Sequence, residues 1–542
     1  MAPTWVKSLA VFTVLGVVSG CTGNVMGGGG PGAGVGGHAD GQGKGGTTGS
    51  GGTTGAGGTS GTGTGGTTGG AGGTLGSGGT TTGAGGTTGV GGTTGGVGGR
   101  VGVGGTPGAA GATGTGGAST PDAGPPVGNC PGNCTNPPVG SCSAPQVRIT
   151  TVALGATLSY STDETLVVPL AIAAKPGGGS RLAWVTGYVR YASSTASQVH
   201  VGELDCTDQL VGTPFAVSGH DFQDLAADGN GGVVVVTRDS AGGPDAQHCG
   251  DVNNLCVLPS DRPGCYDMYM VRYDCAGTEQ WATKLTTASA ATPGYTSGGG
   301  SNQFVWWYQH HGRLAYDGTN YAAYFCDAIT ITNNQCPAGA GRVDIHEGDR
   351  MQVVGPTGAV LAGHDSFGGG CSHSWTTRLV WDPRTSHFVM VCATDNNCRI
   401  AQPNPYRTIA TGTCDGTLFG GDVVNAGTAG YWTAWSQGGT IRLEHFTTGA
   451  SDQTVTAGSS MHPHLVSYGT GRMLLTWASG TGMAAQVYDS STGAPIGAQF
   501  TINVPDHPWQ SWKSFPDGSV AYAGVRAASN TVQVARVLPC NP

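Results

Sequence analysis

Residues 225–236 read Leu-Ala-Ala-Asp-Gly-Asn-Gly-Gly-Val-Val-Val-Val, which is a short apolar strand, a tight turn and a second strand rich in valine. Residues 314–325 read Leu-Ala-Tyr-Asp-Gly-Thr-Asn-Tyr-Ala-Ala-Tyr-Phe and place an Asp-Gly turn at the same point. An Asp-Gly step between two apolar runs is typical of a β-hairpin. The same pattern recurs, strongly or weakly, at Leu182, Leu379, Val423, Leu465 and Phe515.

The hairpins belong to a longer repeat. A third strand follows the hairpin in several copies, for example at residues 268–273 and 483–488. Neighbouring copies are about 40–50 residues apart, which is enough for about four strands in each unit. A repeat of this length and content is typical of a β-propeller. The resemblance is to the architecture, because the chain has no Trp-Asp terminus and no paired-glycine motif of a named repeat.

The sequence therefore predicts an all-β fold, a β-propeller of about seven blades, with six or eight also compatible with the spacing. Two stacked β-sandwiches are the structural alternative. In the propeller, residues 147–154 are expected to supply the outer strand of the last blade, beside residues 532–537.

The N-terminal residues predict export. Lys7 precedes a short apolar run that ends at Val18-Ser19-Gly20-Cys21, which is too short to span a bilayer and is typical of a signal peptide. The tetrad resembles the lipobox of bacterial lipoproteins, which implies acylation of Cys21 (the palmitate-type modification), cleavage before it and attachment to a membrane. Thr22 replaces the aspartate of inner-membrane lipoproteins, so the resemblance implies the outer membrane. The alternative is an ordinary signal peptide with Cys21 in a disulfide.

The predicted domains are a signal peptide at residues 1–20, a tether at 21–125, a Cys/Pro-rich entry segment at 126–145 and the propeller at 146–542. The tether is almost entirely Gly, Thr, Ala and Ser, in low-complexity units such as residues 51–58. Such a composition cannot bury enough apolar surface to offset the entropy of ordering it. A disordered linker with an end-to-end distance of about 55 Å is expected.

Cysteine usage also indicates an oxidising compartment. Fifteen cysteines besides Cys21 occur, mostly near turn residues, and their spacing lacks the paired Cys-x-x-Cys knuckles of a zinc site. We expect disulfides, with Cys326–Cys336 and Cys392–Cys398 as local pairs. The odd total leaves at least one unpaired thiol or an intermolecular disulfide. The net charge of −9 without a basic cluster excludes nucleic acid as the expected partner.

Histidines and tryptophans precede the repeat starts, and in a propeller these starts lie at one mouth of the central channel. The candidate binding residues are His220, His310, His311, His373, His462, His464, His507, Trp375 and Trp509. No cofactor motif is present, but converging imidazoles suit a transition metal. They also suit acid/base chemistry on an acidic sugar. A purely structural role at the blade junctions is the third interpretation, and the variable spacing of one to eight residues favours it.

One further motif, Asp228-Gly229-Asn230-Gly231, resembles part of a calcium loop. It lacks the third and fifth ligand positions, so a tight hairpin turn is expected there.

The sequence predicts a membrane-anchored extracytoplasmic lipoprotein of the bacterial envelope, whose propeller binds a glycan or a protein partner. One alternative is an envelope polysaccharide lyase or hydrolase that uses the histidines at the channel mouth. The other is a structural envelope protein. Catalytic residues are not identifiable, and the balance leans against an enzyme.

Overall fold

The computed structural model describes residues 130, 134–158, 170–187, 198–219, 221–239, 266–286, 301–303, 312–331, 344–361, 363–368, 371, 374–394 and 397–541. Among them, no helix combines the length and the hydropathy needed to cross a membrane. The predicted signal peptide and tether, including Cys21, lie outside the described residues.

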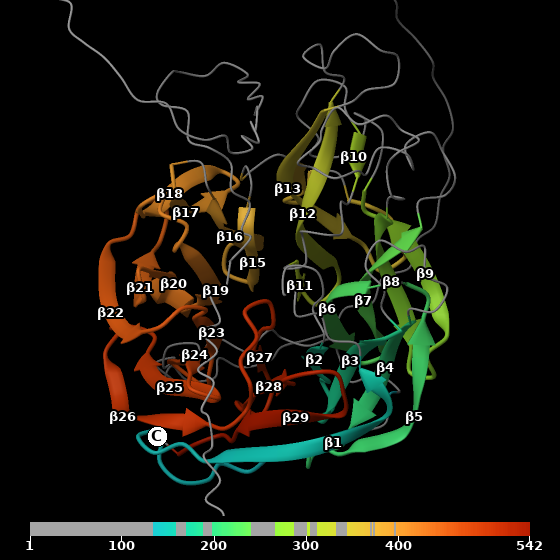
Figure 1. Cartoon of the computed structure of the whole chain (residues 1–542), viewed down its shortest axis with the longest axis horizontal. Coiled ribbons are helices and arrows are strands. Elements are labelled where there is room, and N and C mark those ends of the chain that lie inside the picture. Colours follow the sequence, from blue (N-terminus) through green and yellow to red (C-terminus); the bar gives the residue numbers. More distant parts are fainter. Residues whose placement is uncertain are drawn as a thin grey trace, which may run out of the picture. The chain divides into compact units, whose positions relative to one another are not determined.

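Seven antiparallel sheets form a ring, so the predicted β-propeller with seven blades is confirmed (Figure 1). The innermost strands are β2 (Leu170–Ala174), β6 (Asp221–Asp228), β11 (Arg313–Tyr316), β15 (Ser374–Asp382), β19 (Phe419–Asn425), β23 (His464–Ser467) and β27 (Lys513–Ser514). Each innermost strand contacts the next one in this order, and β27 contacts β2, which closes the ring.

The other strands complete each blade in meander order. The second strands are β3 (Ser180–Thr186), β7 (Gly231–Asp239), β12 (Tyr321–Ile331), β16 (His387–Thr394), β20 (Tyr431–Gln437), β24 (Arg472–Ser479) and β28 (Val520–Gly524). The third strands are β4 (Gln198–Leu204), β8 (Tyr266–Asp274), β13 (Asp344–Val354), β17 (Arg399–Pro403), β21 (Thr440–Phe446), β25 (Gly482–Asp489) and β29 (Ser529–Val537). The outermost strands are β5 (Leu210–Val217), β9 (Glu279–Lys284), β14 (Phe367–Gly368), β18 (Tyr406–Thr411), β22 (Gln453–Ser459), β26 (Pro495–Ile502) and β1 (Val147–Leu158).

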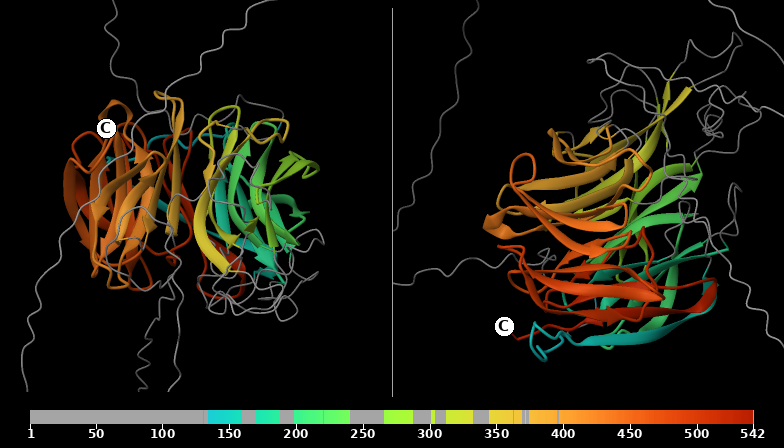
Figure 2. Two further views of the ribbon diagram at one scale, coloured as in Figure 1. Left: turned by 90° about the horizontal axis from the view of Figure 1, so that it is seen from above. Right: turned by 60° about the vertical axis from the view of Figure 1, so that its left-hand side comes forward.

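Blades are numbered 1 to 7 from β2 to β27, and a short strand, β10 (Ser301–Gln303), pairs with β12 in blade 3. The meander gives the ring two faces. The innermost strands begin at one face, which we call the start face. The turns from first to second strand and from third to fourth strand lie at the other, which we call the turn face. Figure 2 shows the sheets from the side.

The N-terminal strand closes the last blade, as the sequence predicts. β1 pairs antiparallel with β29, and Val147 lies opposite Val537. Asp208, in the turn between β4 and β5 of blade 1, is fully buried and pairs with Arg148 of β1 at 2.7 Å and with Arg536 of β29 at 2.6 Å. The strand pairing therefore completes blade 7, and the buried Asp208 carboxylate joins blade 7 to blade 1.

Apolar side chains fill the junctions between blades. The described residues form seven apolar clusters, and each lies between two neighbouring sheets. Trp184 and Trp432 are among the largest fully buried side chains of these junctions. Since the second and third strands are buried on both faces, their runs of valine and alanine need not alternate with polar residues.

A polar contact also recurs between blades. Asp228, at the end of β6, accepts a hydrogen bond from the Tyr321 hydroxyl of blade 3, and Asp382 of β15 accepts one from Tyr431 of blade 5. Asp228 also pairs with Arg272, and its Oδ1 accepts the Asn230 N–H at 2.7 Å within the hairpin. The calcium-like motif is thus a hairpin turn, as expected, whose carboxylate is committed to protein partners.

Two expectations from the sequence are wrong. Leu182 does not open a repeat but lies in β3, because the innermost strand of blade 1 is β2, an alanine-rich segment that lacks the pattern of the other copies. Cys392 does not pair with Cys398. Cys392 lies within β16 opposite Ala401, so Cys398 is beyond the end of the strand pairing and out of its reach.

Five disulfides occur among the described residues. They are Cys130–Cys275, Cys134–Cys206, Cys142–Cys540, Cys371–Cys392 and Cys398–Cys414. The predicted pair Cys326–Cys336 stays a prediction, because Cys336 lies outside the described residues.

Candidate functional site

Ionisable side chains recur at a matching position of the innermost strands. In blades 2 to 6 one such residue stands directly before the first apolar residue of the repeat, and in blade 7 it stands two positions before Phe515. We call the six residues the channel ring: Asp224, Arg313, Arg378, Asp422, His464 and Lys513. Because each lies on an innermost strand, together they surround the axis of the propeller.

Opposite charges of the channel ring pair across the channel. Asp422 Oδ1 lies 3.0 Å from Arg378 Nε in the neighbouring blade and 3.7 Å from Arg313 Nε one blade further. Asp224 Oδ2 lies 2.7 Å from Lys513 Nζ, although blade 1 stands between their two blades. Each of these two long pairs passes a blade that stands between its partners, so it extends across part of the channel. The channel is therefore occupied here by charges that compensate one another.

The two aspartates also set the spacing of adjacent blades. Asp224 accepts the backbone N–H of Leu314 in the next blade at 3.0 Å, and Asp422 accepts that of Leu465 at 3.4 Å. Both aspartates stand at a β-bulge of their innermost strand. A bulge redirects a side chain away from the regular pleat. The paired aspartates are thus structural clamps that repeat in blades 2 and 5.

Two of the predicted binding histidines converge on one carboxylate, and a third is its neighbour in the chain. His464 Nε2 lies 2.8 Å from Asp506 Oδ1, and His462 Nδ1 lies 3.9 Å from Asp506 Oδ2. His507 follows Asp506 in the chain and is buried, with its backbone N–H donated to the Tyr522 hydroxyl at 2.8 Å. Histidines of blade 6 and of the connection to blade 7 do come together at the start face.

These histidines differ in their protonation. Burial alone lowers the pKa of His464, but the carboxylates of Asp506 and Asp422 outweigh it and raise the pKa to about 9. Burial lowers the pKa of His507 to about 3, against the opposing effect of Asp506. Burial also lowers the pKa of His462. At neutral pH His464 is a cation of the channel ring, while its two neighbours are uncharged.

The remaining candidates fall into two groups. Trp509 is buried against Phe419, with ring centroids 5.3 Å apart, so its indole is part of the core and not an exposed stacking platform. His462 packs on the same Phe419 ring, but a quarter of its side chain is exposed, at 25%. The other group cannot be placed. His220, His310, His311 and His373 lie outside the described residues, and of Trp375 only the backbone, in β15, is described.

Of the channel ring, only His464 is among the binding residues predicted from the sequence, and the other five were missed because the residue type varies. The distance from each histidine to the apolar residue that starts the next repeat varies by several positions. The constant signal is an ionisable residue of either sign, placed directly before the apolar start in Asp224-Leu225, Arg313-Leu314 and Arg378-Leu379.

One group of side chains has the composition of a metal site. Within the described part of the chain, only Asp349, Cys371 and Cys392 bring three ligand-type atoms within 4.8 Å of one another. The two cysteines are joined in a disulfide, and Asp349 accepts hydrogen bonds from the Tyr324 hydroxyl and the Cys371 N–H. Metal binding by cysteine requires a free thiolate, so this cluster is a structural staple.

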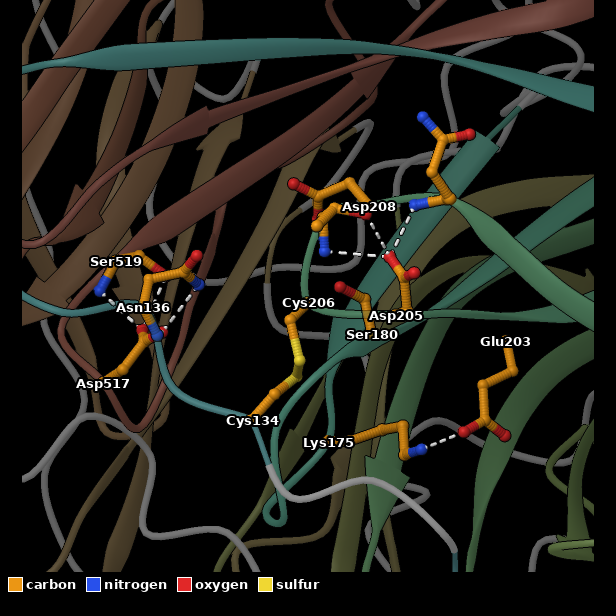
Figure 3. The surroundings of a disulfide bond; sticks show 12 residues. Cys134, Asn136, Lys175, Ser180, Glu203, Asp205, Cys206, Asp208, Asp517 and Ser519 are labelled. Atoms are coloured by element: carbon orange, nitrogen blue, oxygen red, sulfur yellow. Dashed lines mark hydrogen bonds and ion pairs between the residues drawn. A yellow bond between two sulfur atoms is a disulfide. The ribbon is translucent and has the colours of Figure 1, made fainter.

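The turn face carries the entry segment. Figure 3 shows Cys134 bonded to Cys206 of the turn between β4 and β5, with Asn136 beside Asp517. Asn136 donates both its backbone N–H and its side-chain N–H to Asp517 Oδ2 at 2.9 Å. The entry segment is thus attached at the turn face, opposite to the start face.

No known family model matches the chain, and no curated protein matches its sequence. Solved structures do resemble it. The virginiamycin B lyase of Staphylococcus aureus is 9% identical, with a TM-score of 0.35, over 72% of this chain and 100% of that chain. The WD40 domain of Toxoplasma gondii coronin is 10% identical, with a TM-score of 0.36, over 76% of this chain and 90% of that chain. Similarity at this level supports no statement about activity.

We expect the charge on His464 to make the propeller less stable in alkali. The folded pKa of about 9 lies above the unfolded value of 6.5, so the stabilisation is complete below pH 6.5 and is lost as the pH rises through 9. One such group lowers the free energy of unfolding by about 1.4 kcal/mol per pH unit in this window. Urea unfolding between pH 6 and 10 measures it. The variant His464→Gln should lack this slope, and an unchanged slope would assign the titration to another group.

Proposed function

We propose that this chain is an envelope lipoprotein, acylated at Cys21, in which a glycine-rich tether presents the propeller as a binding module for a glycan or a protein outside the membrane. The observation that carries the proposal is the state of the channel ring. Its buried carboxylates are paired with cations of the same ring, Asp422 with Arg378 and Asp224 with Lys513, as a scaffold requires.

The pairing also weighs against the described ring residues as a catalytic centre. A general acid or base must gain and lose a proton within reach of the substrate. Asp422 and His464 could do so only by breaking a buried ion pair, which typically costs about 3–5 kcal/mol. Binding a ligand does not require the channel ring to gain or lose protons. A ligand can contact the surface around the ring instead.

The side chain best placed to contact a ligand is His462. It is partly exposed at the start face and rests on Phe419, and its backbone φ of 58° is in the left-handed region. A neutral imidazole over an aromatic core is compatible with contact to a sugar ring or to a polar protein surface. The five disulfides support residence in an oxidising compartment such as the envelope.

Anchoring is tested with the full chain in a Gram-negative host. We expect an alkyne analogue of palmitate to label the wild-type protein and the protein to fractionate with the outer membrane. The variant Cys21→Ser should lose the label entirely and appear in soluble form. Labelling that persists in Cys21→Ser would reject acylation at this site.

Binding is tested separately, with the oxidised Cys21→Ser protein on a glycan array and against crosslinked envelope proteins. We expect a ligand whose binding falls about tenfold or more in His462→Ala but not in His387→Ala, a matched change of an exposed histidine on the turn face. Turnover of an acidic polysaccharide by the protein would instead support the lyase alternative.

A further inference from the structure

The entry segment is covalently attached to three different parts of the ring. All three attachments lie ahead of β1 in the chain and on the turn face. They are the disulfides Cys130–Cys275 to the β8–β9 turn of blade 2, Cys134–Cys206 to the β4–β5 turn of blade 1, and Cys142–Cys540 to the C-terminal segment.

Hydrogen bonds reinforce each attachment. The Cys130 N–H donates to Gly229 O at 3.1 Å, and the Cys134 N–H donates to Gly177 O at 3.0 Å. Between Cys142 and the C-terminal segment, the Val139 N–H donates to Pro539 O at 2.8 Å. The entry segment thus follows the turn face from blade 2 across blade 1 to blade 7.

The position of β1 makes such attachments consequential. β1 is the outermost strand of blade 7 and pairs with β29 alone, and its first residue, Val147, is the end at which the preceding chain arrives. A pull on that chain would act on the ladder one residue pair at a time, starting at Val147 and Val537. Because β1 closes the ring, its release would open the whole propeller.

We propose that the three disulfides form a covalent load path, which carries tension from the tether into blades 2 and 1 before it can reach the β1–β29 closure. Cys130–Cys275 bears the tension first and Cys134–Cys206 second. Cys142–Cys540 holds the end of the β1–β29 ladder at which the two strands would begin to separate. The protein then has a mechanical function in addition to binding: it holds its ligand under force.

The biological use of this device rests on the proposed function, because tension arises only when the far end of the tether is held. The mechanical behaviour of the three disulfides does not rest on the proposed function. It follows from the described disulfides and can be measured without a lipid on Cys21, so failure of acylation and failure of the load path are distinguishable.

The test is single-molecule pulling on the full oxidised chain. One handle is attached at the N-terminus and the other in the hairpin between Gly480 and Thr481, which joins β24 to β25 on the start face. We expect the wild-type chain to extend only to Cys130 before the ring resists. Removing Cys130–Cys275 by serine substitution should add residues 131–134, about 14 Å, and removing Cys134–Cys206 as well should add residues 131–142, about 40 Å.

Removing all three disulfides should release β1 as an early event at a lower force than any event of the wild type. The matched control lacks Cys398–Cys414, which lies in blade 4 and not in the entry segment, and should extend like the wild type until the ring resists. If the variant without all three disulfides does not fold, the two stepwise variants still carry the test, because they retain Cys142–Cys540. Equal extension in the wild type and the stepwise variants would overturn the load path.

Discussion

Replacing Asp208 by alanine is expected to lower the free energy of unfolding by about 3–5 kcal/mol, the usual cost of removing one partner from a buried ion pair. Its carboxylate is fully buried and lies within 2.7 Å of both Arg148 and Arg536. The side chain of Arg536 is only 2% exposed, so it would be left as a buried cation without its counter-charge. Urea unfolding of the oxidised chain, followed by tryptophan fluorescence, measures the loss.

The control for this prediction is Asp452→Ala. Asp452 Oδ1 also has a close side-chain partner, His445 Nδ1 at 2.5 Å, but the Asp452 side chain is 53% exposed. Exposed pairs are usually worth less than about 1 kcal/mol. If Asp208→Ala cost no more than this control, the buried carboxylate would not be what joins blade 7 to blade 1.

The sequence predicts the blades well where local chemistry repeats. An Asp-Gly turn between apolar runs specifies a hairpin by itself, so the copies at Leu225 and Leu314 reveal two innermost strands. β2 has no such signal, because a short alanine-rich strand becomes an innermost strand only by its place in the ring. The closure by β1 was predictable for a different reason: a propeller of whole blades needs a final outer strand, and an unpaired apolar segment remained at the N-terminal end.

The site was harder to predict than the fold. The channel ring consists of both signs of charge, and its members interact with residues one or two blades away, such as Asp224 with Lys513. No local pattern encodes these partners. The disulfides were not predicted either, because their partners are also distant in the sequence. Cys142 and Cys540 are 398 residues apart and meet only because the chain forms a ring.

This long-range disulfide gives the second large effect. Removing it with Cys142→Ser and Cys540→Ser is expected to lower the free energy of unfolding by about 5 kcal/mol, since the entropy lost by the crosslinked unfolded chain grows with the loop that is closed. The matched change, Cys398→Ser with Cys414→Ser, opens a separation of only 16 residues and should cost about 3 kcal/mol. Urea unfolding of both variants measures the difference.

Hydrogen exchange of the backbone amides adds a second test, because a disulfide that acts only through the entropy of the unfolded chain would not change exchange in one blade relative to another. The disulfide lies directly beyond the end of the ladder at which Val147 faces Val537. Without it, opening of that end no longer has to break a covalent bond, so amides of β1 and β29 should exchange faster than those of β24 and β25. The Cys398–Cys414 variant should leave β1 and β29 unchanged relative to the other blades. Uniform acceleration in all blades would show that the disulfide acts only on the unfolded chain and does not protect the closure.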